Sequence, residues 1–397
     1  MDAVRPVSAG PPALSLRSRL RRIWRTIHLW IGLSAGLVLA IVGLSGAVLV
    51  FAEPIARAEH GDILFPDRPM PDPSGWAPVE TWIAKATARY PQLEHVIVVA
   101  APYSAPLPAA VPLVAGHLRH DPGTPEKHGA VAVDPASGEP LGLVVIEDSW
   151  WGWLVHLHGA LLAPPYGYVV TAVAGLLFLA SAVSGLYLWW PRNGRTWRQA
   201  LTVKRGARGR RMLLDWHNVA AVWLFVPLAV AVLSGVYILR PAWFDGALRA
   251  ASTIRAPGPQ TLAAPARATC PDGTGIGRAL AVARAAHPDL DLRLMIMPEQ
   301  AALPYQISLA PRGAPGRVQS TELWVARDCP RILLARTGHD LSAAETVKAW
   351  MSAVHASFGL GLIGQIAVFA SGLCLPLLFV TGLLLWTKRR AARSPRV

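Results

Sequence analysis

The sequence has little charge and little cysteine for its length. Only 16% of its 397 residues are charged and only three are cysteine, whereas 53% are hydrophobic and the mean hydropathy is +0.36. A soluble chain of this length carries more charge, because its surface must be polar. The composition therefore predicts an integral membrane protein.

Motifs of several enzyme classes are also absent. The sequence has no P-loop, no Cys-x-x-Cys-His for covalent haem, and no Ser or Cys nucleophile in a recognised elbow. Residues 359–364 match G-x-G-x-x-G, but no strand precedes them and they lead into an apolar run, so we interpret the match as fortuitous. The chain therefore lacks a nicotinamide, flavin or ATP module of its own.

Four apolar runs are long enough to cross a bilayer. A helix rises about 1.5 Å per residue, so roughly 20 apolar residues cross about 30 Å of hydrocarbon. The runs cover residues 27–51, 166–190, 214–239 and 362–386. The first follows a cluster of arginines, yet it is longer than the apolar core of a signal peptide, so we expect a retained anchor.

Basic residues are concentrated in the segments between and beyond these runs that we place in the cytoplasm. Residues 1–26 contain six Lys and Arg, residues 191–212 contain eight and no acid, and residues 387–397 contain five. By contrast, residues 52–150 contain six basic and 13 acidic residues, and residues 240–350 contain 13 and nine. Because basic loops stay in the cytoplasm, both termini are predicted there. The net charge of +14 thus indicates topology and membrane lipid, not nucleic-acid binding.

Each of the four runs contains a step in which a hydroxyl residue precedes a glycine. The steps are Ser45-Gly46, Ser184-Gly185, Ser234-Gly235 and Thr381-Gly382. His28 and His217 each lie 18 residues before the glycine of a step, and His158 and His355 each lie 27 residues before one. These matched offsets predict a helix, outer segment, helix unit that is used twice.

The two outer segments also agree in pattern. Residues 81–91 resemble residues 278–288, and β-rich runs follow at 95–101 and 292–298. We therefore expect each outer segment to be a small α+β module.

Two of the three cysteines could form a disulfide. Cys270 and Cys329 both lie in the second outer segment, where an oxidising compartment would allow pairing, but sequence alone does not supply the geometry. Cys374 lies in the last apolar run.

The four matched histidines are candidate metal ligands. Equal offsets place His28 and His217 at equal depth near the cytoplasmic face, where they could oppose each other across one ligand. His158 and His355 should occupy short helices at the outer boundary, because proline or glycine clusters follow them. Neutral imidazole binds haem iron, but histidines in membranes also pack helices or handle protons. The spacing alone leaves these alternatives open.

Small residues follow His28 at intervals of three or four. They include Gly32, Gly36, Gly43 and Gly46. Such a stripe could admit a flat macrocycle, and it could equally bring two helices together.

The other histidines carry weaker signals. His156 lies beside His158 on the opposite side of a helix and has no counterpart before the fourth run, so we treat it as secondary. His117 and His120 could suggest a metal site outside the membrane, but two histidines without a carboxylate framework are weak evidence.

Several short motifs occur near the ends of the apolar runs. They are Ile27-His28-Leu29-Trp30-Ile31-Gly32-Leu33, Leu157-His158 within residues 153–162, Asp215-Trp216-His217, His355-Ala356-Ser357-Phe358-Gly359, Val380-Thr381-Gly382 and Trp386. Together they resemble the PepSY-associated transmembrane family of iron-regulated membrane proteins. The resemblance extends from about residue 20 to 390. Many relatives have Thr in all four hydroxyl-glycine steps, whereas three are Ser here, and His156 stands where a basic or polar residue is common; neither departure touches a proposed ligand.

The resemblance implies an α-helical integral membrane protein of the bacterial inner membrane. Four transmembrane helices would come from the duplicated unit, and two small PepSY-like α+β modules would be extracytoplasmic. The predicted segments are a basic N-terminus (1–26), helix one (27–51), the first module (52–150), an interfacial helix and helix two (151–190), a basic loop (191–213), helix three (214–239), the second module (240–343), an interfacial helix and helix four (344–386), and a basic tail (387–397).

The family includes ferrisiderophore reductases that carry two b-type haems and reduce iron(III) chelates in the periplasm. Carried over by position, His28 and His217 would be the axial ligands of the cytoplasmic-side haem, and His158 and His355 those of the outer haem. The resemblance thus implies a reductase that passes electrons from a quinol or a cytoplasmic reductase to a ferric siderophore or other Fe(III) chelate, with its catalytic residues unassigned. The alternative is a haem-free regulatory or scaffold protein whose outer modules bind a protease or another partner. Transport ranks last, because the runs have almost no polar residue at mid-depth besides Gln365.

Overall fold

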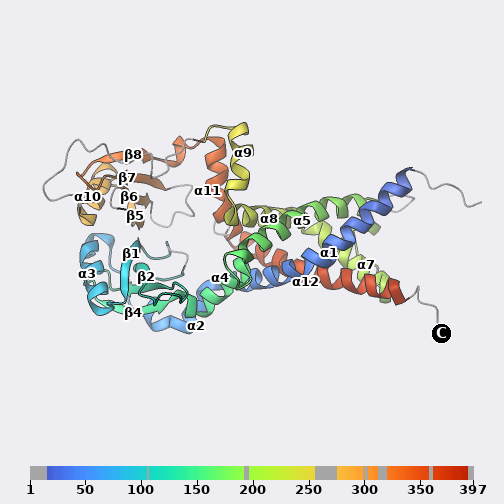
Figure 1. Cartoon of the computed structure of the whole chain (residues 1–397), viewed down its shortest axis with the longest axis horizontal. Coiled ribbons are helices and arrows are strands. Elements are labelled where there is room, and N and C mark those ends of the chain that lie inside the picture. Colours follow the sequence, from blue (N-terminus) through green and yellow to red (C-terminus); the bar gives the residue numbers. More distant parts are fainter. Residues whose placement is uncertain are drawn as a thin grey trace, which may run out of the picture.

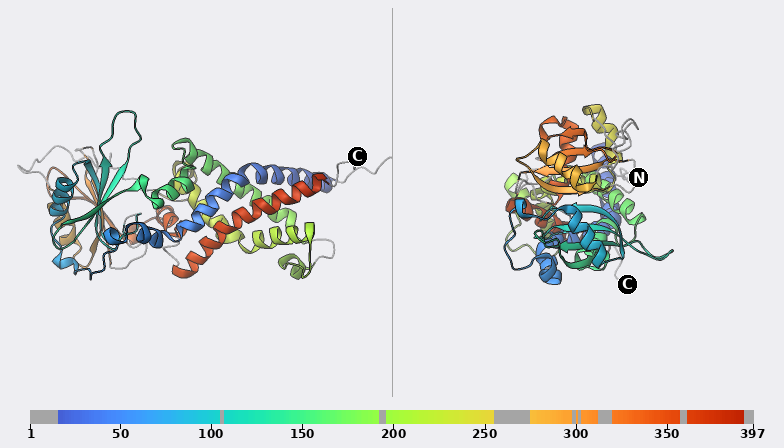
Figure 2. Two further views of the ribbon diagram at one scale, coloured as in Figure 1. Left: turned by 90° about the horizontal axis from the view of Figure 1, so that it is seen from below. Right: turned by 90° about the vertical axis from the view of Figure 1, so that its left-hand side faces the viewer.

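The computed structural model describes residues 16–104, 107–191, 196–254, 275–297, 300, 303–311, 320–356 and 361–391. They form an elongated molecule, with a sheet and its covering helices at one end and a bundle of long helices at the other (Figures 1 and 2). The first and the last described residues both lie at the end of the bundle remote from the sheet (Figure 1). We call this the far end, and the opposite end of the bundle the sheet end.

The long helices belong to the bundle and the shorter ones connect it to the sheet or cover the sheet. The helices are α1 (Leu16–Leu49), α2 (Ala52–Leu64), α3 (Val79–Arg89), α4 (Trp150–Ala160), α5 (Tyr166–Trp189), α6 (Trp197–Leu201), α7 (Gly209–Trp223), α8 (Phe225–Leu239), α9 (Ala242–Ala251), α10 (Ile276–Ala286), α11 (Ala343–His355) and α12 (Gly361–Ala391).

Three of these helices, α1, α5 and α12, are long and apolar enough to cross a membrane. The pair α7 and α8 also meets this criterion together, although the two helices are bent by 67° where they join. Large apolar side chains on the outside of the bundle remain exposed, as expected for a lipid-facing surface; Val183 on α5 is 65% exposed and Ile363 on α12 is 79% exposed. The chain is therefore a multi-pass membrane protein with three spans, or four if the bent pair is one span.

The bend between α7 and α8 differs from the continuous run that the sequence predicts over 214–239. Leu224, between the two helices, has φ −97° and ψ 8° and so leaves the helical conformation. Pro227 lies in the first turn of α8, where its missing N–H needs no partner, while its ring would clash with the carbonyl of Trp223 in an uninterrupted helix. Proline thus divides this segment into two helices.

The strands form a single antiparallel sheet. They are β1 (Leu93–Ala100), β2 (Leu113–Leu118), β3 (His128–Val133), β4 (Pro140–Val145), β5 (Asp291–Ile296), β6 (Tyr305–Ala310), β7 (Thr321–Val325) and β8 (Ile332–Arg336). Their order is β4-β3-β2-β1-β5-β6-β7-β8. The two outer segments therefore join through β1 and β5, where Val99 pairs with Met295, so that each covers an edge strand of the other.

Helices cover both faces of this sheet. On the face remote from the bundle, α3 and α10 bury Trp82 and Leu280 against strand residues such as Val99 and Met295 (Figure 1). On the opposite face of the first four strands, Leu64 of α2 and Trp151 of α4 pack with Ala100, Ala130 and Val144. The strands alternate these two sets of side chains, because successive residues of a strand point to opposite faces.

The backbones of α1 and α12 come into contact where the two helices cross. A Cβ built on Gly43 would lie 2.6 Å from the backbone oxygen of Gly372, and a Cβ on Gly372 would lie 2.6 Å from that of Gly43. Small residues allow such backbone contact between helices in membranes. Next to this crossing lies a buried cluster of Ala35, Leu39, Ala174, Leu228, Cys374 and Leu375.

The cysteines are only partly described. Cys374 is a buried free cysteine in the bundle. Cys329 is disulfide-bonded, and Cys270, the partner that the sequence predicts for it, lies outside the described residues.

Two short helices, α4 and α11, stand between the sheet and the long helices α5 and α12 (Figure 1). Ser149 begins α4, because its Oγ accepts the N–H of Gly152 at 3.0 Å. Ser342 begins α11 in a capping box with Glu345. Residues 357–360 lie outside the described residues, so the glycine break predicted there stays a prediction except that α12 begins at Gly361.

Candidate functional site: two histidine pairs

The four matched histidines form two pairs. The ring centres of His28 on α1 and His217 on α7 are 6.3 Å apart, with an interplanar angle of 83°. Those of His158 on α4 and His355 on α11 are 5.9 Å apart, with an angle of 46°. The first pair lies toward the far end of the bundle and the second at the sheet end; we call them the far-end pair and the sheet-end pair.

Each histidine of the far-end pair lies against a hydroxyl-glycine step of another helix. His28 Nδ1 is 3.1 Å from Ser184 Oγ, and a Cβ on Gly185 would lie 3.0 Å from His28 Cε1. The same Nδ1 is 3.1 Å from the carbonyl oxygen of Ser181. His217 Nδ1 is 2.9 Å from Thr381 Oγ1, next to Gly382.

The sheet-end pair uses the other two steps. His158 Nδ1 is 2.8 Å from the carbonyl oxygen of Val42 and 3.4 Å from Ser45 Oγ. A Cβ on Gly46 would lie 2.7 Å from His158 Cε1, so the ring requires glycine there.

His355 repeats this arrangement on α8. His355 Nδ1 is 2.9 Å from the carbonyl oxygen of Ala231 and 3.1 Å from Ser234 Oγ. A Cβ on Gly235 would lie 2.8 Å from His355 Cε1. All four steps therefore hold one histidine each.

These hydrogen bonds determine which ring nitrogen carries the proton. A carbonyl oxygen can only accept, so Nδ1 of His28, His158 and His355 must donate. Thr381 Oγ1 already donates to the carbonyl of Leu377 at 2.7 Å, so it accepts from His217. Nε2 of each ring is left with its lone pair, which is the form that ligates a metal.

The ring spacings suit one metal ion within each pair. A metal–imidazole bond of about 2 Å, with roughly 1 Å from nitrogen to ring centre, separates the centres of two facing rings by about 6 Å. The observed 6.3 Å and 5.9 Å agree with this separation. Within the described parts of the chain, no three or more His, Cys, Asp or Glu side chains converge as a metal site, whereas each pair brings two imidazoles together.

A cavity of about 770 Å³ surrounds the far-end pair. Its walls are mainly apolar and include Leu29, Phe178, Phe225 and Phe379. A Cβ on Gly32 would meet no atom within 4 Å, so the α1 wall is open at this point. The size and lining are those of a site for a sizeable apolar ligand.

Four arginines also line this cavity. They are Arg21, Arg25, Arg210 and Arg389. Arg21 Nη2 donates to the carbonyl of Leu188 at 2.7 Å, which anchors one of them between α1 and α5. Guanidinium groups bind carboxylates well, so a flat apolar ligand with carboxylate groups, as haem is, fits the donors present.

The match to known families covers this whole arrangement. A family model described as PepSY-associated TM region matches residues 25–389. The chain belongs to this family. No curated protein matches the chain. The PepSY-associated TM match includes all four paired histidines, the four hydroxyl-glycine steps and both halves of the sheet.

The sequence predicted which histidines share a depth, but it missed their contacts with the hydroxyl-glycine steps. In the sequence the steps indicate only a repeat, although the equal offsets between histidine and step are a signal that could have predicted contact between them. His156, on α4 two residues before His158, belongs to neither pair. The sequence assigns the arginines of the cavity only a role in membrane orientation, because it does not show that α1, α7 and α12 bring them together.

Proposed function

We propose that this protein is a di-haem b electron-transfer protein of the bacterial inner membrane that reduces a ferric siderophore or another Fe(III) chelate to release iron(II). In this proposal His28 and His217 hold one haem, and His158 and His355 hold the other. Four spans form two helix, module, helix units, with both termini in the cytoplasm and the sheet in the periplasm.

The chief support is that each of four matched histidines lies against a hydroxyl-glycine step and near one other histidine. A histidine that merely packs helices needs no partner imidazole, whereas both pairs have the spacing of two axial ligands. The Nδ1 hydrogen bonds orient the rings and make Nε2 more basic, as the acceptors at Nδ1 of metal-ligating histidines do.

Matching helix contacts support the duplicated unit. Gly175 and Gly372 each lie ten residues before the glycine of their step. Gly372 packs on Gly43 and Ala47 of α1, and Gly175 packs on Val232 and Val236 of α8. Gly43 and Val232 each lie three residues before the glycine of a step, and Ala47 and Val236 each lie one residue after it. The packing of α12 on α1 is therefore repeated in the packing of α5 on α8.

Each haem would supply a one-electron redox centre. The protein would supply the ligands, the neighbouring charges and the apolar surroundings of that centre. Two histidines per iron leave no open coordination position, which favours electron transfer over oxygen binding. The arginines of the far-end cavity would offset the negative charge of the haem carboxylates. The walls are mainly apolar, so a bound macrocycle would bury much of its apolar surface against protein.

The two ends of the bundle suit different partners. The far end carries the basic segments, so a quinol or a cytoplasmic reductase would deliver electrons there. The sheet end faces the two modules, which would dock the chelate. Hard oxygen ligands hold iron(III) better than iron(II), so adding one electron loosens the metal from the chelate.

Absorption spectroscopy of detergent-purified protein tests this proposal. We expect a Soret band and about two haems per chain, with His28→Ala or His217→Ala losing one haem and His158→Ala or His355→Ala losing the other. His156→Ala is the control and should retain both. Colourless protein from cells supplied with haem, in which all four histidines can be replaced without loss of function, would contradict the proposal. It would favour the haem-free regulatory or scaffold function.

A further inference from the structure

A second pair of histidines lies in the sheet, outside the bundle. His117 of β2 and His128 of β3 are directly paired across the two strands, so their side chains leave the same face. Their ring centres are 4.9 Å apart, with an interplanar angle of 49°. The sequence separates them by a loop, so only the strand register shows that they are neighbours.

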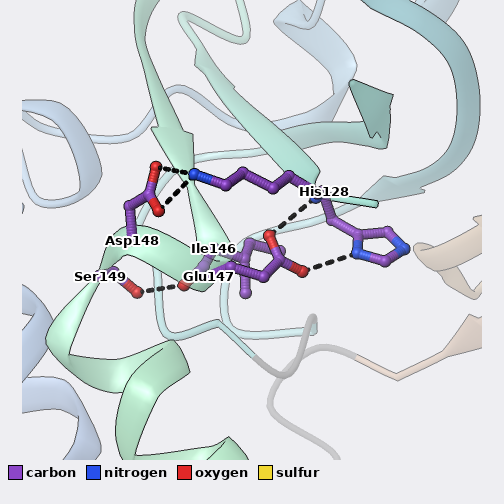
Figure 3. A network of polar contacts seen from close by, with 6 residues as sticks. His128, Ile146, Glu147, Asp148 and Ser149 are labelled. Atoms are coloured by element: carbon purple, nitrogen blue, oxygen red, sulfur yellow. Dashed lines mark hydrogen bonds and ion pairs between the residues drawn. The ribbon is translucent and has the colours of Figure 1, made fainter. Parts of the chain in front are cut away.

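Each of these rings has a glutamate near Nδ1, and that of His128 is hydrogen-bonded to it. His128 Nδ1 is 2.7 Å from Glu147 Oε1, while Glu147 Oε2 accepts the backbone N–H of His128 at 2.8 Å (Figure 3). His117 Nδ1 is 2.7 Å from Glu126 Oε1, an ion-pair distance at which the two groups do not have the geometry of a hydrogen bond. These two carboxylates were not recognised around His117 and His120 in the sequence, because Glu126 lies nine residues after His117 and Glu147 lies 30 residues after it.

A carboxylate at Nδ1 orients an imidazole for ligation through Nε2. Metal-ligating histidines usually have such a partner, which sets the tautomer and raises the basicity of the ligating nitrogen. Glu147 is itself held in place by its two contacts with His128, and its side chain is 20% exposed. In Figure 3 the Nδ1 edge of the His128 ring faces Glu147, and the other ring nitrogen lies on the side away from the network drawn there.

The rings of His117 and His128 lie closer together than the rings of either histidine pair in the bundle. With bonds of about 2 Å and roughly 1 Å to each ring centre, two imidazoles at a tetrahedral angle on one metal have centres about 5 Å apart. The 4.9 Å between His117 and His128 matches this, and it is too short for two rings on opposite sides of one ion. The pair therefore suits adjacent positions on a metal.

From these contacts we infer that His117 and His128 form a binding site for a divalent transition-metal ion of the Fe²⁺, Ni²⁺ or Zn²⁺ class. Imidazole suits these borderline ions, whereas Fe³⁺ prefers oxygen ligands. Among the described residues no third His, Cys, Asp or Glu converges on the pair, so water or an external chelate completes the coordination. The negative charges of Glu126 and Glu147 offset the charge of the ion.

Calorimetric titration of Ni²⁺ into the full-length protein in detergent, purified without a polyhistidine tag, tests this site. We expect one site that is lost in His128→Ala and at least about tenfold weaker in Glu147→Gln, because the glutamine no longer polarises the ring. Asp148→Asn is the matched control, since this neighbouring carboxylate pairs with Lys127 and contacts no histidine (Figure 3). Asp148→Asn and His120→Ala should bind Ni²⁺ as the wild type does.

Two results would overturn the inference. One is no Ni²⁺ binding by wild type, and the other is binding that survives His128→Ala or is indifferent to Glu147→Gln, which would indicate an adventitious surface contact. Thermal melting of each variant separates loss of the site from loss of the fold, and His117→Gln provides a second variant if His128→Ala does not fold. The haem spectrum is read in the same samples and should not change, so this inference and the proposed function fail independently.

Discussion

His158 lies so close to Gly46 that a Cβ on that glycine would be 2.7 Å from the Cε1 atom of the ring. The contact joins α4 to α1 across 112 positions of the chain. It holds the imidazole between a glycine surface and the carbonyl of Val42, which accepts its Nδ1 proton. The ring orientation of a candidate ligand thus depends on a residue that could never ligate a metal.

Substituting this glycine should displace the histidine without removing it. We expect Gly46→Ala to lose the sheet-end haem, because the added methyl group must push the ring away at a cost of about 1–3 kcal/mol. Haem content and the Soret band per chain measure the result. Gly246→Ala on α9 is the control, since a Cβ there meets no atom within 4 Å. Two haems retained in Gly46→Ala would show that the contact is not required.

The hydroxyl of Thr381 should tune the far-end haem through His217. Thr381→Val removes the acceptor for Nδ1 at nearly constant volume, which makes Nε2 a weaker donor and favours the reduced iron. A hydrogen bond of about 1 kcal/mol corresponds to roughly 40 mV, so one of the two midpoint potentials should rise by about that amount. Spectroelectrochemical titration measures it. Thr381→Ser should restore the wild-type value, and a titration curve unchanged in Thr381→Val would contradict the prediction.

The arginines of the far-end cavity should raise the potential of the same haem. Arg210→Gln removes a positive charge from the cavity lining, which destabilises the electron-rich reduced state, so the far-end midpoint potential should fall and the haem should be lost more easily. Arg208→Gln is the matched control, because Arg208 is exposed and is not part of the cavity. Both variants lose one basic residue from the same segment, so an effect of topology would appear equally in each.

The crossing of α1 and α12 should be sensitive to any side chain. Gly372→Val places its Cβ against the backbone of Gly43, and relieving that overlap should cost at least about 1–3 kcal/mol of stability. A thermal melt in detergent, followed by circular dichroism, should show a lower midpoint than wild type. Gly246→Val on α9, whose Cβ meets no atom within 4 Å, should melt close to wild type. Equal midpoints for the two variants would show that the close contact between α1 and α12 does not contribute to stability.

Much of the architecture could be predicted because it depends on composition and spacing along one segment. Apolar length predicts spans through the thickness of the bilayer, and α1, α5 and α12 confirm three of them. Helical and strand patterns predicted α3 and α10, each followed by a strand, which the structure contains. The sequence did not predict the bend at Leu224, because Pro227 in a long apolar run is compatible with either a kink or a break.

By itself, then, the sequence determined that this is a multi-pass membrane protein of the PepSY-associated TM family, and it identified the four histidines through their equal offsets. Only the tertiary structure decided that each histidine lies against a glycine of another helix, that the two outer segments share one sheet, and that Glu126 and Glu147 lie next to His117 and His128. The reason is physical. Offsets along one helix follow from a fixed rise per residue, whereas contacts between distant segments depend on packing and strand register, which no local pattern specifies.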